Sequence, residues 1–127
     1  MPTILVVDDN ADNRYVLMQM LQINGYAVVS AVNGCDALAV AEHHEPDLVL
    51  MDLSMPVMDG WTATALLKQK PQLTHIPVIA VTGHVTTDNL RRASEAGCSD
   101  HLAKPIDYEA LLQTVAVHLH SNLQDSV

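Results

Sequence analysis

The middle of the chain reads Leu48-Val49-Leu50-Met51-Asp52, four consecutive apolar residues that end in a carboxylate. The apolar residues do not alternate with polar ones, which is typical of a strand covered on both faces. Strands of this kind form parallel sheets that lie between layers of helices. The stretch therefore predicts an α/β fold with a buried parallel strand at residues 48–51.

Similar short apolar runs occur on both sides of this one. They are Ile4-Leu5-Val6-Val7, Ala27-Val28-Val29 with its extension Ala31-Val32, and Val78-Ile79-Ala80-Val81. A fifth, weaker strand is expected at residues 100–103 from the regular spacing of the runs. Segments with apolar residues at helical spacing separate the runs. Five successive βα units predict a doubly wound α/β domain with a five-stranded parallel sheet.

Capping and breaking residues mark the helix ends. We expect Asp12 to cap the first helix and Asn24-Gly25 to end it. Pro71 must stop the third helix, and Gly97 closes the fourth. The 127 residues have the size of one domain, so we expect a single domain over residues 1–127.

The charge and the cysteines exclude several classes of protein. A formal net charge of -9 argues against binding to nucleic acid or to an anionic membrane surface. No apolar run approaches the roughly 18 residues of a membrane span, and no secretory signal precedes the first strand. Cys35 and Cys98 lie too far apart to suggest a disulfide framework. A cytoplasmic protein is the expectation.

Polar residues follow the strands at their carboxyl ends. Asp8 and Asp9 follow the first strand, Asp52 the third, Thr82 the fourth and Lys104 the fifth. The carboxyl ends of parallel strands meet at one edge of a sheet, which is where open α/β sheets bind ligands. Three carboxylates, a hydroxyl and an ammonium group are therefore expected in one pocket.

This group of side chains is suited to magnesium and a phosphoryl group. Carboxylates within a few Å repel, and Mg²⁺ removes the conflict because it prefers hard oxygen ligands. Lys104 and Thr82 then supply a positive charge and a hydroxyl donor. Taken singly, each residue has an ordinary alternative: Asp8 and Asp9 as helix caps, the others as turn or surface residues. Their meeting at one edge favours the chemical interpretation.

Several segments match a known family, and they match it in order. They are Leu5-Val6-Val7-Asp8-Asp9-Asn10, Asp47 to Pro56 with Asp59-Gly60, Ile76 to Gly83, Ala96-Gly97-Cys98 and His101-Leu102-Ala103-Lys104-Pro105. From Ile4 to about Leu119 the chain resembles the receiver domain of bacterial two-component response regulators, in the single-domain form of chemotaxis regulators. The resemblance implies a flavodoxin-like fold with strand order 2-1-3-4-5.

The resemblance also assigns an acceptor and a metal site. Asp52 is then the phosphoacceptor and a ligand of Mg²⁺. Asp9 is expected to touch the ion directly and Asp8 to act largely through water. The backbone carbonyl of Ser54 occupies the position that usually completes the metal site.

The remaining roles concern switching and the lifetime of the phosphate. Thr82 corresponds to the switch hydroxyl and Lys104 to its cation partner, with a Lys104–Pro105 bond that is usually cis. His101 replaces the usual switch aromatic. One possibility is that His101 titrates as part of the switch. The favoured expectation is that it is a partly buried residue that occupies this position without a switching role. Ser54 and His84 are expected to affect how long the phosphate lasts.

The resemblance implies a signalling function. A histidine kinase or a histidine phosphotransfer protein is expected to pass its phosphoryl group to Asp52. The face of the fourth helix, fifth strand and fifth helix then changes and controls a protein target. Such a domain catalyses its own phosphorylation and dephosphorylation but turns over no separate substrate, so it is not counted as an enzyme.

Three alternatives are weaker. A Mg²⁺-dependent phosphatase of the haloacid dehalogenase type normally carries a second Asp where this chain has Ser54. A nucleotide-binding module needs a glycine-rich loop after the first strand, which is not found. A receiver-like domain that no longer takes phosphate conflicts with the complete pocket.

Overall fold

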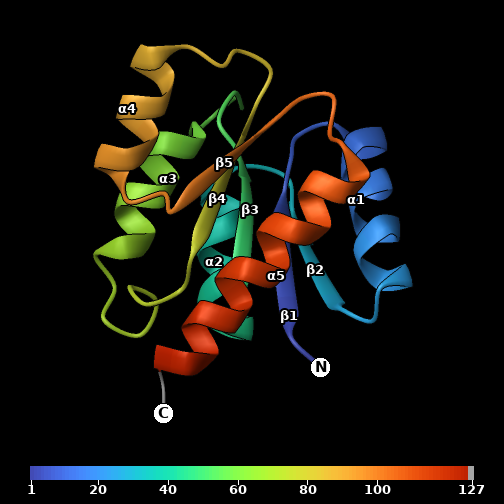
Figure 1. Ribbon diagram of the computed structural model, residues 1–127. Helices are drawn as coiled ribbons and strands as arrows, with labels where there is room; N and C mark the ends of the chain where they lie inside the picture. The colour runs from blue at the N-terminus through green and yellow to red at the C-terminus, as the bar shows by residue number, and fades with distance from the viewer. Residues whose placement is uncertain (126–127) are drawn as a thin grey trace.

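The computed structural model describes the backbone of residues 1–125 and the side chains of residues 1–119. Strands and helices alternate along the whole chain (Figure 1). In order they are β1 (Thr3–Val7), α1 (Ala11–Ile23), β2 (Ala27–Ala31), α2 (Gly34–His44), β3 (Leu48–Asp52), α3 (Gly60–Lys68), β4 (Val78–Thr82), α4 (Thr87–Ala96), β5 (Asp100–Ala103) and α5 (Tyr108–Asp125). All five strands are found where the sequence predicts them.

The five strands form one parallel sheet. Their order is β2-β1-β3-β4-β5, and each neighbouring pair is parallel. This confirms the predicted fold class and strand order. The order turns back at β1, which lies between β2 and β3. The carboxyl ends of the central strands β1 and β3 therefore lie next to each other.

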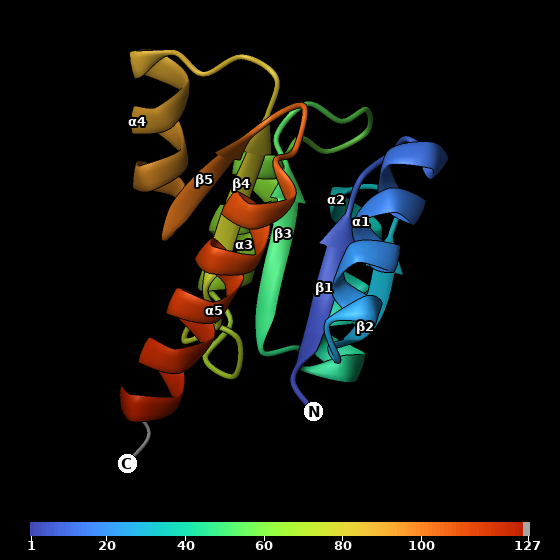
Figure 2. The same ribbon diagram turned by 45° about the vertical axis from the view of Figure 1, so that its right-hand side comes forward.

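The helices cover both faces of the sheet, as Figures 1 and 2 show. Alternate residues of β1 point to opposite faces, since Ile4 and Val6 belong to one apolar cluster and Leu5 and Val7 to another. The first cluster includes residues of α1 and α5, and the second includes residues of α2 and α3. The helix α4 packs through Ala93 against a third, smaller cluster.

Burial explains why the strands read as continuous apolar runs. Every residue of β3 and β4 is buried, because helices cover both sides of these central strands. The edge strand β5 is mostly exposed, with only Leu102 buried, which accounts for its weak sequence signal. The core is aliphatic, as a chain without Phe requires.

Side-chain caps begin most of the helices. Asn10, Asn33, Asp59 and Thr86 each accept a hydrogen bond from the backbone N–H three residues ahead, at the start of α1, α2, α3 and α4. The prediction that Asp12 caps α1 is wrong. The helix begins two residues earlier than expected, and Asp12 lies in its first turn.

Two predicted helix ends are confirmed. Asn24 is the C-cap of α1, and Gly97 ends α4 with a positive φ of 114°. None of the helices within the described residues is both long and apolar enough to span a membrane. Cys35 and Cys98 are free thiols, one exposed and one partly buried.

Candidate functional site

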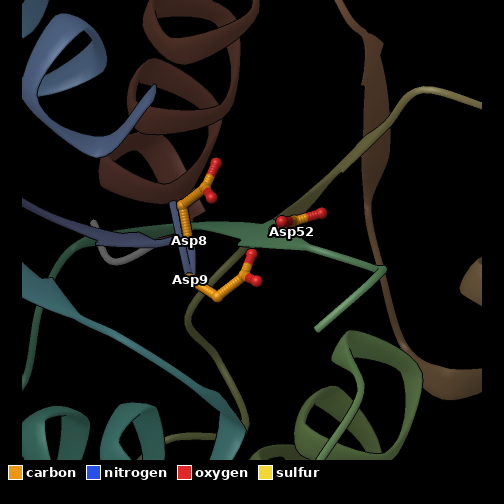
Figure 3. A group of neighbouring side chains, drawn as sticks. All are labelled: Asp8, Asp9 and Asp52. Atoms are coloured by element: carbon orange, nitrogen blue, oxygen red, sulfur yellow. The ribbon is translucent and has the colours of Figure 1, made fainter. Parts of the chain in front are cut away.

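The predicted site residues gather at the carboxyl edge of the sheet. Asp8 follows β1, Asp52 is the last residue of β3, Thr82 is the last of β4, and Lys104 follows β5. Figure 3 shows Asp8, Asp9 and Asp52 side by side at the ends of β1 and β3. One carboxylate oxygen from each lies within 4.8 Å of the others. The strand order produces this meeting, because β1 and β3 are neighbours in the sheet.

Asp8 is held firmly by its surroundings. Its N–H donates to the carbonyl oxygen of Ala31 at 3.2 Å, which continues the pairing of β1 with β2. Its Oδ1 accepts the N–H of Asn10 at 2.8 Å, and its carbonyl oxygen accepts Nη1 of Arg14 at 2.8 Å. The backbone and Oδ1 of Asp8 are therefore fixed by hydrogen bonds, and Oδ2 lies on the side of Lys104.

That second oxygen, Asp8 Oδ2, is buried and has no hydrogen-bond partner among the described residues. The ammonium Nζ of Lys104 lies 3.6 Å away, close enough for an ion pair but too far for a hydrogen bond. A buried carboxylate oxygen without a partner is costly, and a bound cation is one way to satisfy it.

Asp52 is nearly as buried as Asp8, with 3% of its surface exposed. Its Oδ1 accepts the N–H of Ser54 at 3.1 Å, and its Oδ2 lies 3.2 Å from Nζ of Lys104. Burial raises the pKa of Asp52, and the nearby Asp8 carboxylate adds to this, while Lys104 and the Ser54 N–H act in the opposite direction.

The site fits a magnesium ion. Asp8, Asp9 and Asp52 offer three hard oxygen ligands from a small volume, and Asp9 is exposed to solvent, which suits an ion that keeps several waters. The unpartnered Asp8 Oδ2 supplies independent support for a cation here. Ser54 lies beside them in the loop after β3, and its predicted role as a carbonyl ligand stays a prediction.

Lys104 reaches the acidic group from β5. Its N–H donates to the carbonyl oxygen of Thr82 at 2.8 Å, so the end of β5 is tied to the end of β4. The Lys104–Pro105 peptide is cis, as the resemblance implies. The ammonium group thus lies between Asp8 and Asp52, where it balances part of their charge.

The predicted switch residues lie on the neighbouring strands β4 and β5 but differ in their exposure to solvent. The Thr82 side chain is buried, and its Oγ1 exchanges hydrogen bonds with the backbone of His84. The His101 side chain is 43% exposed, with Nδ1 3.9 Å from Asp100 Oδ1. The expectation of a partly buried His101 is therefore wrong, because the edge strand β5 turns this residue toward solvent.

An apolar groove opens beside the acidic group, and the sequence did not reveal it. Its volume is about 410 Å³. It lies between α1 and the segment that follows β5, and its lining residues are Asp8, Asn13, Val16, Leu17, Met20, Lys104, Pro105 and Ile106. Val16 is 48% exposed, so the α1 side of the groove offers apolar surface to a partner.

Comparison with known proteins agrees with this geometry. Residues 4–116 match the family described as response regulator receiver domain. The polar-differentiation response regulator DivK of Brucella anthropi is 34% identical over 117 residues, covering 92% of this chain and 95% of that protein.

Two solved structures share the fold. The chemotaxis protein CheY4 of Vibrio cholerae has a TM-score of 0.88 at 30% identity, covering 91% of this chain and 97% of that one. The receiver domain of the sensor histidine kinase PA1611 of Pseudomonas aeruginosa also has a TM-score of 0.88, at 32% identity, covering 94% of this chain and 98% of that one. The PA1611 domain has a magnesium ion coordinated in its active site cleft. The sequence match, the fold and the acidic group at its edge show that this chain belongs to the response regulator receiver domain family.

Proposed function

We propose that this receiver domain accepts a phosphoryl group on Asp52 from a phosphohistidine. The supporting observation is that the Asp52 carboxylate meets Asp8, Asp9 and the ammonium of Lys104 at one edge of the sheet. A carboxylate beside a lysine and two further carboxylates suits phosphoryl transfer, in which positioning and charge balance do most of the work. The donor is a histidine kinase or a histidine phosphotransfer protein.

The transfer is an in-line displacement at phosphorus. A carboxylate oxygen of Asp52 forms the new O–P bond as the P–N bond to the imidazole breaks, and the imidazole leaves with the electron pair. The N–H of Ser54 already holds Oδ1 of Asp52, so the carboxylate is oriented before the donor arrives. Lys104, 3.2 Å from Oδ2, balances charge on the phosphoryl oxygens.

Asp8, Asp9 and Asp52, with the Ser54 carbonyl, would hold Mg²⁺. When bound, the ion neutralises the acidic group and the phosphoryl oxygens. Asp8 Oδ2, which has no hydrogen-bond partner among the described residues, would face the ion or one of its ligand waters. Asp9 lies at the exposed side of the group, where ligand waters have access.

The product is an acyl phosphate on the protein itself, so we do not classify the domain as an enzyme with a separate substrate. Ser54 and His84 are both exposed, in the loops that follow β3 and β4. We propose that their side chains affect how easily water reaches the acyl phosphate and so set its lifetime. A haloacid dehalogenase-type phosphatase remains the alternative, and turnover of a generic phosphate ester would favour it.

The groove between α1 and the segment after β5 is the docking surface that we propose for the donor. It includes Asp8 and Lys104 of the site itself, so a partner seated there brings its histidine to Asp52. The exposed Val16 suits an apolar helical surface on that partner. The downstream target is proposed to bind the α4–β5–α5 face, where a smaller groove lies between Leu90 of α4 and His101 of β5.

Intact mass measurement tests the function. Phosphoramidate and Mg²⁺ should add one phosphoryl group to the wild type and none to Asp52→Asn. Asp47→Asn is the matched control, because Asp47 precedes β3 at the opposite edge of the sheet. It should be phosphorylated like the wild type. An equal mass gain in Asp52→Asn, or multiple turnover of p-nitrophenyl phosphate, would overturn the proposal.

A further inference from the structure

The Thr82 hydroxyl is already engaged in this structure. Its oxygen accepts the N–H of His84 at 3.0 Å and lies 3.3 Å from the His84 carbonyl oxygen, to which it donates. The Thr82 side chain is buried, whereas His84 is exposed in the loop after β4. To donate to a phosphoryl group on Asp52, the hydroxyl must give up the bond to the His84 carbonyl. Its movement therefore changes the loop after β4.

The same His84 carbonyl is also bound by α4. Nδ2 of Asn89, in the first turn of α4, donates to this oxygen at 2.8 Å. The N–H of Asn89 is in turn capped by Oγ1 of Thr86 at 3.1 Å. One carbonyl oxygen thus joins the switch hydroxyl of β4 to the start of α4.

Trp61 of α3 continues the connection. Its indole Nε1–H donates to the carbonyl oxygen of Asn89 at 3.4 Å. The Arg92 guanidinium of α4 lies 3.8 Å from the centre of the indole ring, a cation–π contact. The ring packs against the cluster that contains Leu53, the residue after Asp52. Trp61 is therefore held from both α4 and the end of β3.

We propose that the chain of contacts Thr82–His84–Asn89–Trp61 transmits the phosphorylation state of Asp52 to the corner formed by α3 and α4, with Asn89 as the coupling residue. This inference rests on the proposed function. A hydrogen bond from Thr82 to a phosphoryl oxygen is charge-assisted and roughly twice as strong as the neutral bond to His84 that it replaces. After the exchange, Asn89 is left as the side-chain donor that holds the His84 carbonyl, and the first turn of α4 shifts with the loop.

This route does not pass through His101. That side chain is on the exposed edge strand β5, and its nearest charged partner is Asp100. The Thr82 hydroxyl, by contrast, is one shared carbonyl away from α4. His101, which stands where the family usually has an aromatic switch residue, is therefore not needed for the signal to reach α4 and α3.

Trp61 is the single tryptophan of the chain, so its fluorescence reports on this corner alone. Phosphoramidate and Mg²⁺ are added to the full chain, and intact mass and tryptophan emission are recorded together. The wild type and the control Ser94→Ala, an exposed position of α4, should gain one phosphoryl group and change in emission. Asn89→Ala should gain the phosphoryl group while its emission change falls at least threefold.

Thr82→Val and Thr82→Ser keep the test decisive if Asn89→Ala does not fold. Thr82→Val should be phosphorylated more slowly, and it should show no emission change per phosphoryl group gained. Thr82→Ser should recover the emission change, because only serine restores a hydroxyl. A full emission change in phosphorylated Asn89→Ala or Thr82→Val would overturn the coupling. A wild type that gains mass without an emission change would overturn it as well. A wild type that gains no mass would overturn the proposed function, and the coupling with it.

Discussion

The guanidinium of Arg14 donates a hydrogen bond from Nη1 to the carbonyl oxygen of Asp8, 2.8 Å away. Arg14 belongs to α1 and Asp8 follows β1, so the bond spans the turn that carries the acidic pair. The Asp8 carbonyl belongs to the peptide that joins Asp8 to Asp9. By fixing this peptide, Arg14 orients both carboxylates without contacting either of them.

Replacing Arg14 should weaken magnesium binding. In Arg14→Met the Asp8–Asp9 peptide loses its side-chain donor, and we expect about a tenfold loss of Mg²⁺ affinity, the scale for a supporting partner of a metal ligand. Arg14→Lys should recover part of the affinity because it retains a charged donor. Titration calorimetry with Mg²⁺ measures this, with Arg91→Met, at an exposed ion pair of α4, as the control. Equal affinities in Arg14→Met and the control would refute the positioning role.

Neutralising Asp52 should stabilise the metal-free protein. Burial raises the pKa of Asp52, against the opposing effect of Lys104. A carboxyl group with a raised pKa binds protons more readily in the folded chain, so folding stability decreases as the pH rises through that pKa. Asp52→Asn removes this cost. Its melting temperature in EDTA should exceed that of the wild type at about pH 7, and the difference should shrink toward about pH 4, the ordinary aspartate range.

Scanning calorimetry across this pH range makes the measurement. A stabilisation of the same size at every pH would mean that packing, and not the charge of Asp52, is the cause. Saturating Mg²⁺ should reverse the order, because the ion stabilises the wild type more than a variant that has lost one carboxylate.

Gly60 is the first residue of α3 and lies against the backbone at the end of β3, the strand that carries Asp52. A Cβ at this position would meet the backbone of Asp52 and come within 2.8 Å of Cα of Leu53. Backbone cannot move aside cheaply, so Gly60→Ala should destabilise the protein by about 2–4 kcal/mol and lower the phosphorylation rate. Gly83→Ala is the control, since a Cβ there meets nothing within 4 Å. Urea unfolding of the two variants compares them, and equal losses would contradict this account.

Much of the fold and site follows from the sequence, for identifiable reasons. The central strand β3 is readable because burial on both faces requires an unbroken apolar run from Leu48 to Met51. The placement of Asp8, Asp52, Thr82 and Lys104 at one edge of the sheet follows from parallel topology, because each stands at the end of a strand.

Other features depend on contacts that leave no local pattern. The sequence does not distinguish Asn10 from Asp12 as the cap of α1, because Asn and Asp both cap helices and only the turn geometry selects Asn10. The bond from Asn89 to His84 and the stacking of Arg92 on Trp61 depend on how α3 and α4 pack. The exposure of His101 is not evident from the family motif, because the motif does not show that β5 is an edge strand.

The loop after β3 carries a strained residue next to the site. Val57 has a φ of 71°, in the left-handed region that β-branched residues avoid, and its side chain is 83% exposed. Such a conformation costs on the order of 1–3 kcal/mol, and the exposed side chain gives little packing in return.

Val57→Gly should therefore stabilise the protein. Glycine adopts the positive φ without a steric penalty, although its unfolded chain has more entropy to lose, so we expect a net gain of about 1 kcal/mol. Val85→Gly is the matched control: Val85 is also exposed, but its φ is not positive, so only the entropy loss applies and stability should fall by roughly 0.5–1 kcal/mol. Opposite signs for the two variants in urea unfolding are the expected result. A loss of stability in both would show that the backbone of Val57 is not strained, and that the β3–α3 loop holds its shape at no cost to the fold.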